Sequence, residues 1–395
     1  MGSTTNYYQA KKPWSTFKDK MLDWYLTPYI YMLLSIPKPL YIIDCFAGKG
    51  KFDDGNIGSP LIIADKIQKT QEDIKQTNKN IYGIFIEIKY FRQLKDNLKD
   101  YNNCKVLEGS FEQNIDEICK YTTEGNSFLY IDPYGIKSLN FDSFKRIFRS
   151  SKNSIEVFIN FNSIGFIREA CRILKYKIKD IIEEGDDESY EIDENDLSIE
   201  KMNQIFNGNS WVDLINKFYK DELDIHTLEE NLVKNYLSNY RTKFRYTINI
   251  PIRMKQKNIP KYRMIFCTNN ENGLLLMHKN MFDTMSKMKD IELNGQISLF
   301  EIYKNPSDTK ILEDNIWDIL LKKGKIRYKE LVCQIINETG LQYSEREMQN
   351  VLNYMKEQNI INTEIRLKKG YTPRDISKLK AWNSKNYDTI IIRCD

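Results

Sequence analysis

The sequence lacks the features that mark several common protein classes. Its apolar runs are short: the stretch from Tyr29 to Ile36 ends well before the roughly 20 residues that span a bilayer, and the N-terminus is polar. The seven cysteines include no CxxC pair, so neither a disulfide framework nor a zinc knuckle is indicated. With only two histidines, His226 and His278, a histidine-based triad or metal site has little support. These absences favour a cytoplasmic protein that is neither membrane-bound nor secreted and holds no metal.

The length of the chain limits the number of domains, and its charged residues are concentrated in particular segments. The 395 residues suffice for two or three domains, and a hydrophobic content of 41% lets each bury a core. The net charge of +4 is small, so local clusters matter more than the total. The stretch from Asp180 to Glu200 holds eleven acidic and no basic residues, which predicts a solvated insertion. The stretch from Arg241 to Arg263 holds eight basic and no acidic residues, which predicts a cationic hairpin tip.

A strand, a loop and a helix recur along the first part of the chain. Short, uniformly apolar strands that alternate with helical segments of about ten residues predict a doubly wound, Rossmann-like α/β sheet with both faces covered. Two antiparallel strands at 244–252 and 262–268 are expected to close its edge. Two short helices broken at Pro28 are expected before the first strand. The expected parallel strands are 40–44, 81–88, 105–107, 127–132 and 157–160, with helices at 59–68, 90–99, 111–120 and between 199 and 241.

The C-terminal part has a different pattern. Helices at about 309–322, 327–338 and 344–358, followed by strands at 360–366 and 388–393, predict a winged helix-turn-helix. The expected wing is basic, with seven basic residues and one acid from Arg366 to Lys385, and includes Lys368 and Lys369. Nucleic acid is the expected partner, although such modules also dock on proteins. We therefore expect one domain over 1–302, with a helical, acidic insertion at about 165–240, and a second over 308–395.

The first strand leads into a glycine turn, Asp44-Cys45-Phe46-Ala47-Gly48-Lys49-Gly50. At this edge of an α/β sheet, glycines let the backbone approach a nucleotide. The turn is not a dinucleotide fingerprint, because residue 53 is Asp, and it is not a phosphate loop, because Lys51 is followed by Phe52. It fits the D/E-x-F-x-G-x-G pattern of class I methyltransferases better, although a purely structural turn stays open. The candidate cofactor residues here are Asp44, Phe46, Gly48 and Gly50.

Two further positions follow the next strands. Glu87 ends the second strand, where an acid can accept the ribose hydroxyls of a nucleoside cofactor or can cap the following helix. Ser110 and Phe111 follow the third strand, where a small polar side chain and an apolar neighbour can hold an adenine. Together with Asp132, which ends the fourth strand, these residues complete the expected cofactor set.

The fourth strand ends in Asp132-Pro133-Tyr134-Gly135. Asp132 and the Pro133 carbonyl can accept the two hydrogens of an exocyclic amine and direct its lone pair at a methyl group, while Tyr134 stacks on the base. Transfer from a sulfonium donor needs mainly this positioning and no strong base. An ordinary Asp-Pro turn is the alternative.

Together these motifs resemble the three-Cys-motif partner family, bacterial proteins named for a radical-SAM-like neighbour that carries three cysteines. The resemblance covers roughly residues 14–290, and the C-terminal part is similar to the winged helix-turn-helix of some members. It implies a class I fold that binds S-adenosyl-L-methionine (SAM), and residues 132–135 are also similar to the turn of tRNA guanine-N2 methyltransferases. Its markers are Lys20–Leu26, Asp44–Gly50, Gly58–Pro60, Phe85–Glu87, Asp132–Gly135, Ile159–Phe161 with Arg168, and Phe266–Asn270.

The leading hypothesis is a SAM-dependent methyltransferase that acts on an exocyclic base amine of DNA or RNA. The expected substrate-binding residues are Arg253, Lys255, Lys257 and Lys261 on the hairpin tip, and Arg366, Lys368 and Lys369 on the wing. The alternative is a SAM-binding, non-catalytic partner subunit of the radical-SAM-like protein. A nicotinamide-dependent oxidoreductase would need the missing third glycine.

Overall fold

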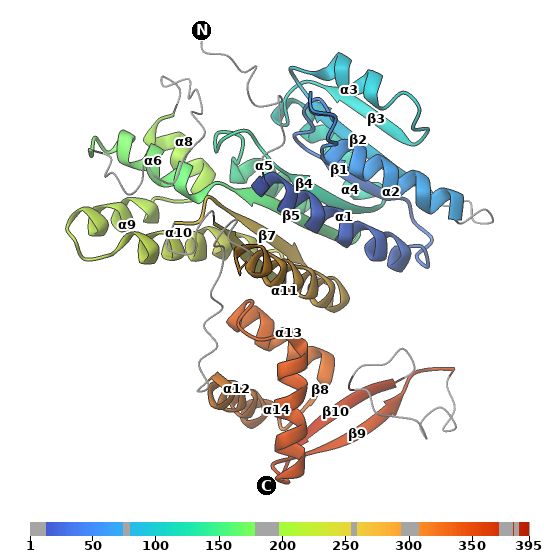
Figure 1. Ribbon diagram of the computed structural model, residues 1–395, viewed down its shortest axis with the longest axis vertical. Helices are drawn as coiled ribbons and strands as arrows, with labels where there is room; N and C mark the ends of the chain where they lie inside the picture. Colours follow the sequence, from blue (N-terminus) through green and yellow to red (C-terminus); the bar gives the residue numbers. More distant parts are fainter. Residues whose placement is uncertain are drawn as a thin grey trace. The chain divides into compact units, whose positions relative to one another are not determined.

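The computed structural model describes residues 13–73, 80–177, 197–253, 259–293, 308–370, 382 and 387–394. These residues group into two compact units (Figure 1). The first comprises Met1–Asn269 with Thr284–Phe300, and the second comprises Asn270–Asp283 with Glu301–Asp395. Most of the acidic block predicted as an insertion falls in 178–196, outside the described residues.

A seven-stranded sheet in the order β3-β2-β1-β4-β5-β7-β6 forms the centre of the first unit. The pairs among β1 to β5 are parallel, and β7 runs antiparallel to both of its neighbours. This mainly parallel sheet confirms the predicted α/β class, including the antiparallel strands at its edge. The strands are β1 (Leu40–Asp44), β2 (Ile81–Glu87), β3 (Cys104–Glu108), β4 (Asn126–Ile131), β5 (Ile155–Phe161), β6 (Tyr246–Ile252) and β7 (Tyr262–Thr268).

Helices cover both faces of this sheet, as uniformly apolar strands require. On one face, α1 and α2 lie side by side, and Tyr25 of α1 packs against Phe128 of β4 and Phe266 of β7 with ring centroids 5.6 and 5.1 Å apart. On the other face, α4, α5, α6 and α10 share a core with alternate residues of the strands. The helices of this unit are α1 (Pro13–Leu33), α2 (Ser59–Asp73), α3 (Phe91–Asn97), η1 (Glu112–Asn114), α4 (Ile115–Glu124), α5 (Phe141–Ser150), α6 (Ser163–Ile173), α8 (Ile199–Phe206), α9 (Ser210–Tyr219) and α10 (Ile225–Tyr240). Helix α11 (Glu271–Leu293) begins in the second unit, and its last part, from Thr284, belongs to the first.

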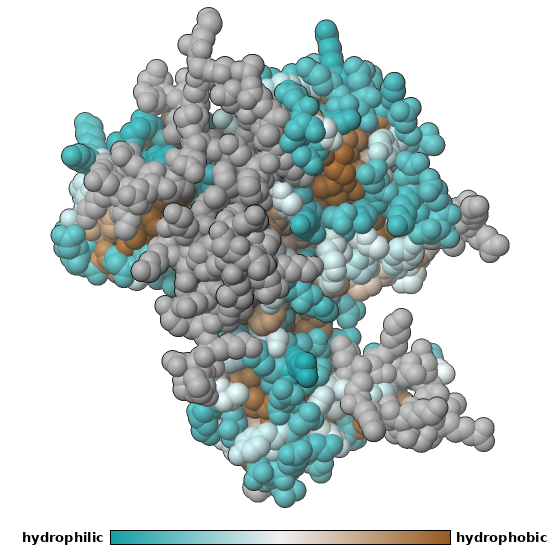
Figure 2. Space-filling model, in the orientation of Figure 1, coloured by the Kyte–Doolittle hydropathy of each residue, from teal (hydrophilic) through white to brown (hydrophobic). Residues whose placement is uncertain are grey.

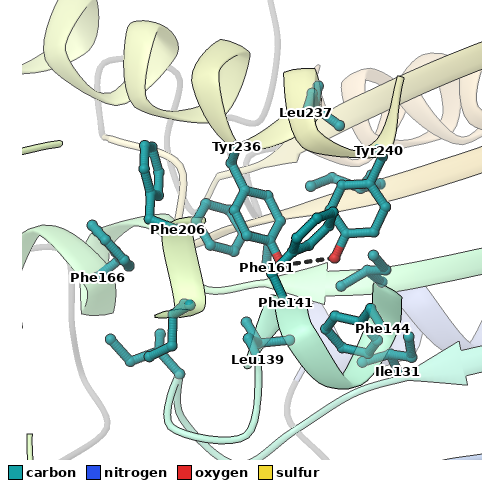
Figure 3. Packing of buried hydrophobic residues seen from close by; sticks show 14 of the residues in the cluster. Ile131, Leu139, Phe141, Phe144, Phe161, Phe166, Phe206, Tyr236, Leu237 and Tyr240 are labelled. Atoms are coloured by element: carbon teal, nitrogen blue, oxygen red, sulfur yellow. Dashed lines mark hydrogen bonds between the residues drawn. The ribbon is translucent and has the colours of Figure 1, made fainter. Parts of the chain in front are cut away.

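Aromatic side chains fill the second of these layers (Figure 3). Phe161 of β5 stacks on Tyr236 of α10 with centroids 4.2 Å apart, and the Tyr236 and Tyr240 hydroxyls are hydrogen-bonded at 2.9 Å. Phe141 and Phe144 of α5 close the layer against Tyr240. This packing joins the helices that follow β5 to the sheet, so the insertion helices belong to the same core.

The prediction of two helices broken at Pro28 was wrong, because α1 is one helix that continues through this proline. An internal proline costs a helix roughly 3 kcal/mol, since it lacks an N–H and clashes with the preceding turn. Tyr25, Leu26, Tyr29 and Ile30, on both sides of Pro28, are all buried. Burial of such side chains contributes about 1.5–3 kcal/mol each, which offsets the cost of the proline.

The second unit combines helices with a small antiparallel sheet in the order β8-β10-β9. Its helix α14 begins with a capping box, in which Ser344 and Glu347 exchange hydrogen bonds between side chain and backbone. The three predicted helices and two predicted strands are present, whereas β8 was not predicted. The elements are α12 (Asp308–Lys323), β8 (Lys325–Arg327), α13 (Tyr328–Thr339), α14 (Glu345–Glu357), β9 (Ile361–Leu367) and β10 (Tyr387–Arg393).

The described part of the chain has no helix long and apolar enough to cross a membrane. On the face shown in Figure 2, hydrophilic residues dominate the described surface and apolar residues show in smaller areas. Among the described residues, no cluster of three or more His, Cys, Asp or Glu side chains could hold a metal ion.

Candidate functional site

A cavity of about 360 Å³ opens at the carboxyl ends of β1, β2, β3 and β4. Ligand sites in doubly wound sheets lie at this edge, and the volume falls in the range of roughly 300–1,000 Å³ typical of small-molecule sites. Residues from four separate turns and from α1 reach it. The lining includes Lys18, Asp19, Phe46, Gly48, Gly50, Glu87, Ser110, Phe111, Glu112, Asp132, Pro133, Tyr134, Asn160, Lys261 and Tyr262.

The glycine turn after β1 is fixed to its neighbours by backbone hydrogen bonds. The Ala47 N–H donates to the Ile86 carbonyl at 3.0 Å, and the Gly58 N–H donates to the Gly50 carbonyl at 2.8 Å. Gly48 and Gly50 have φ values of 65° and 79°, which L side chains rarely adopt. A Cβ on Gly50 would also lie 3.0 Å from a methyl group of Leu94. The turn therefore requires glycine for both conformation and space.

Glu87 connects the glycine turn to the helix after β2. Its Oε2 accepts the Gly48 N–H at 2.7 Å, and its Oε1 accepts the N–H groups of Lys89 and Tyr90 at 2.7 and 2.8 Å. A carboxylate offers about four lone-pair positions, so these three bonds leave one, on Oε2, for a ligand. Glu87 therefore holds the turn before α3 and also lines the cavity, whereas its contact with a ribose stays a prediction.

Asp44 does not line the cavity. Its side chain is fully buried, and Oδ1 accepts the N–H of Phe46 at 3.2 Å. Burial, together with the nearby charges of Asp132 and Asp19, raises the pKa of Asp44 to about 7. Its Oδ2 has no hydrogen-bond partner among the described residues. Asp44 therefore lies outside the lining, with its carboxyl group bonded to its own loop, and its contact with a cofactor stays a prediction.

The residues after β3 give the cavity one apolar and one polar side chain, Phe111 and Ser110. Phe111 is buried and packs against Phe46, with ring centroids 5.4 Å apart. Ser110 is held by Gln113, whose side-chain oxygen accepts the Ser110 N–H at 2.8 Å and whose own N–H donates to Ser110 Oγ at 3.3 Å. The structure thus brings Phe46, Ser110 and Phe111 to one side of the cavity.

Asp132, after β4, accepts hydrogen bonds from three side chains. Its Oδ2 accepts hydrogen bonds from Lys18 Nζ and, at 3.4 Å, from the Tyr130 hydroxyl, and its Oδ1 accepts Asn160 Nδ2 at 2.7 Å. Pro133 and Tyr134 line the cavity beside it, and Tyr134 is 55% exposed. The predicted amine-binding turn therefore lies in the same cavity as Gly48 and Glu87.

Sequence reasoning missed Lys18 as a site residue, and it cited Asn160 only as a family marker. Lys18 lies on the same face of α1 as Leu22 and Tyr25, both fully buried, so a charged residue on an apolar helix face was the available signal. Lys49, in contrast, does not line the cavity: its Nζ lies 3.4 Å from Asp53 and over the Tyr90 ring.

The predicted substrate-binding cations are distributed differently from the expectation. Lys261 is only 6% exposed and lines the cavity, so it does not project from a hairpin tip. The physical reason is that its N–H extends the β6–β7 pairing by donating to the Ile252 carbonyl at 2.8 Å. Arg253 is partly buried, whereas Lys255 and Lys257 lie outside the described residues. The three cations that the sequence predicted on a wing belong to the second unit: Arg366 and Lys369 are exposed, and Lys368 lies 3.7 Å from Asp388.

No family model and no curated protein matches the sequence. Solved structures with some similarity include protein LPL1258 from Legionella pneumophila, 11% identical over 72% of this chain and 96% of that chain, with a TM-score of 0.40. Spermidine synthase from Thermotoga maritima is 10% identical over 68% of this chain and 66% of its own, with a TM-score of 0.30. The plantazolicin methyltransferase BpumL bound to SAH is 8% identical over 68% of this chain and 90% of its own, with a TM-score of 0.28. Because these TM-scores are low, the similarities carry no argument about function. The function proposed below depends on the strand order of the sheet and on the residues of the cavity. The resemblance to three-Cys-motif partner proteins stays a prediction.

Proposed function

We propose that the first unit is a SAM-dependent methyltransferase that acts on an exocyclic amine of a nucleic-acid base. One observation carries this proposal: a single cavity at the carboxyl edge of the sheet contains the glycine turn, Glu87, the Ser110–Phe111 wall and the Asp132–Tyr134 turn. Four turns that are far apart in sequence thereby offer complementary parts of one ligand site.

The residues of the cavity fit an adenosine-type cofactor. Phe46 and Phe111 would flank the adenine, and the remaining lone pair of Glu87 Oε2 would accept a ribose hydroxyl. The lining holds both carboxylates and lysines; of the carboxylates, Asp19 and Glu112 would attract the ammonium and sulfonium groups of such a ligand. When bound, SAM supplies a methyl group activated by its positively charged sulfur.

The Asp132–Tyr134 turn would present the amine. Asp132 Oδ1 and the Pro133 carbonyl would accept its two hydrogens, which frees the nitrogen lone pair to form the new N–C bond. The electrons of the broken C–S bond stay on sulfur, and the methylated amine then releases one proton to water. Tyr134 is exposed enough to stack on a base extruded from a helix or offered by a single strand.

The second unit would act as a winged helix-turn-helix that holds the polynucleotide. Its helices α13 and α14 precede two strands, and the last strand lies between the other two, which suits such a module. Helix α14 carries more acidic than basic residues, whereas Arg366 and Lys369 on the wing are exposed. We therefore propose that phosphates contact the wing more than the helix.

Membership of the three-Cys-motif partner family and the domain limits 1–302 and 308–395 form part of the same proposal. In the alternative function, the chain binds SAM and docks on a radical-SAM-like protein without transferring a methyl group. The alternative predicts cofactor binding with no product on any nucleic acid.

The test is incubation of the full chain with SAM labelled in its methyl group and with DNA or RNA at low salt. The proposal predicts labelled nucleic acid with the wild type and at least roughly a 100-fold lower kcat with Asp132→Ala, since an interaction at the reacting nitrogen is lost. Asp142→Ala, an exposed carboxylate on α5, is the matched control and should keep wild-type activity. Cofactor binding without any labelled product would favour the partner-subunit alternative.

A further inference from the structure

We propose that Lys18 is a positioning residue that holds Asp132 as a fixed, negatively charged acceptor for the amine. This inference rests on the proposed function and concerns the same cavity. It assigns a role to α1, which the sequence motifs did not connect to the chemistry.

The hydrogen bonds of Asp132 define how its carboxylate can be used. Among the described residues, Lys18 Nζ and the Tyr130 hydroxyl donate to Oδ2, and Asn160 Nδ2 donates to Oδ1. With about four lone-pair positions on a carboxylate, these three donors leave one, and it is on Oδ1. The carboxylate acts only as an acceptor, so the amide nitrogen of Asn160 must face it. Lys18 and Asn160 thus fix which oxygen of Asp132 remains for a substrate hydrogen.

The ion pair lies in a largely buried setting. The Lys18 and Asp132 side chains are only 9% and 16% exposed, so solvent screens their attraction weakly. The charged and titratable groups around the pair are Asp19 on α1, Asp44 on β1 and Tyr130 on β4, and Lys261 and Tyr262 from the β7 side line the same cavity. Lys18 is the cation that contacts Asp132, so its ammonium group offsets the negative charge of the neighbouring carboxyl groups.

A proton on Asp132 would be harmful to the proposed reaction. A protonated carboxyl group donates a hydrogen bond, whereas the amine needs an acceptor to direct its lone pair at the methyl group. Lys18 therefore acts through Asp132 and needs no contact with the substrate. Its loss should lower kcat while leaving cofactor binding nearly unchanged.

The experiment measures methyl transfer by the full chain for wild type, Lys18→Met and Lys18→Arg, over a range of pH. Lys20→Met, an exposed lysine two residues along α1, is the matched control. We expect Lys18→Met to lower kcat at neutral pH on the order of 100-fold, with KM for SAM within about twofold of wild type. We also expect Lys18→Arg to keep a substantial part of the activity, because arginine keeps the positive charge beside Asp132. If Lys18→Met does not fold, Lys18→Gln removes the charge while keeping an N–H donor.

The outcomes separate this inference from the proposed function. Kinetics and a pH profile of the folded charge-removing variant that match those of Lys20→Met would overturn the role of Lys18 while the methyltransferase proposal stands. A loss of SAM affinity in proportion to the loss of kcat would also overturn it, because Lys18 would then be a cofactor-binding residue. A wild type that methylates no nucleic acid would overturn both.

Discussion

Glu156 offers a sharp test of the electrostatics of the sheet. This glutamate lies on β5 with 2% exposure, and it accepts the Tyr25 hydroxyl at 2.5 Å and the Thr268 hydroxyl at 2.7 Å. Burial raises the pKa of Glu156 from its ordinary value of 4.5 to about 7, and the two hydrogen bonds only partly oppose the rise. The perturbation we choose is Glu156→Gln, which keeps the hydrogen-bonding shape and removes the charge.

The magnitude follows from the linkage between protonation and folding. Between pH 4.5 and 7 the folded chain binds a proton at Glu156 that the unfolded chain has released, so this group's contribution is fully present below 4.5 and is lost as pH rises through 7. The difference between 7 and 4.5, at about 1.4 kcal/mol per pKa unit, corresponds to about 3 kcal/mol. Glutamine has no charge to bury, so Glu156→Gln should gain stability over wild type by about this amount as pH rises from about 5 to about 8.

Urea unfolding at several pH values measures this difference. Asp44 titrates in the same direction in the same unit, but it is present in both proteins and its effect drops out of the comparison. Glu124→Gln is the matched control, because Glu124 also accepts a tyrosine hydroxyl, that of Tyr41 at 3.0 Å, but is exposed. A stability difference between wild type and Glu156→Gln that stays constant from about pH 5 to about pH 8 would refute the reasoning.

Two further predictions concern nucleic-acid binding. Tyr134→Ala should weaken binding of single-stranded nucleic acid by about 1–3 kcal/mol, because one stacking platform is lost, and should leave SAM binding unchanged. Fluorescence titration measures both affinities. Tyr354→Ala is the control, since Tyr354 is also half exposed, and it should have a smaller effect. Replacing both Arg366 and Lys369 by Ala should reduce the slope of log affinity against log salt by about 2 if each contacts one phosphate, and an unchanged slope would argue against a DNA-binding wing.

The strands of the first unit could be predicted because their sequences carry the signal locally. β1 and β4 are mostly apolar, are buried along their whole length and lead into turn residues, as expected for strands covered on both faces. β8 was missed because its three residues, Lys325–Arg327, bury only Ile326 and have no readable period. The single helix across Pro28 was missed because its stability comes from packing that a local pattern does not contain.

The sequence also predicted only part of the candidate site. The positions of Glu87 and Asp132 could be predicted, since each follows a recognisable strand of a parallel sheet. Which oxygen of each carboxylate remains for a ligand could not, because backbone N–H groups and distant residues such as Lys18 decide it. The burial of Lys261 was also unpredictable, because a lysine in a basic stretch is typical of an exposed surface.

Calorimetric titration of SAM and of its demethylated product into the full chain tests the central claim most directly. The account predicts micromolar binding by wild type and at least about a tenfold loss with Glu87→Gln, because the substitution weakens both the glycine turn and the ribose contact. Glu108→Gln is the matched control, since Glu108 pairs with Glu87 in the sheet register but is exposed, and it should bind like wild type. No binding by wild type at millimolar ligand would contradict the account.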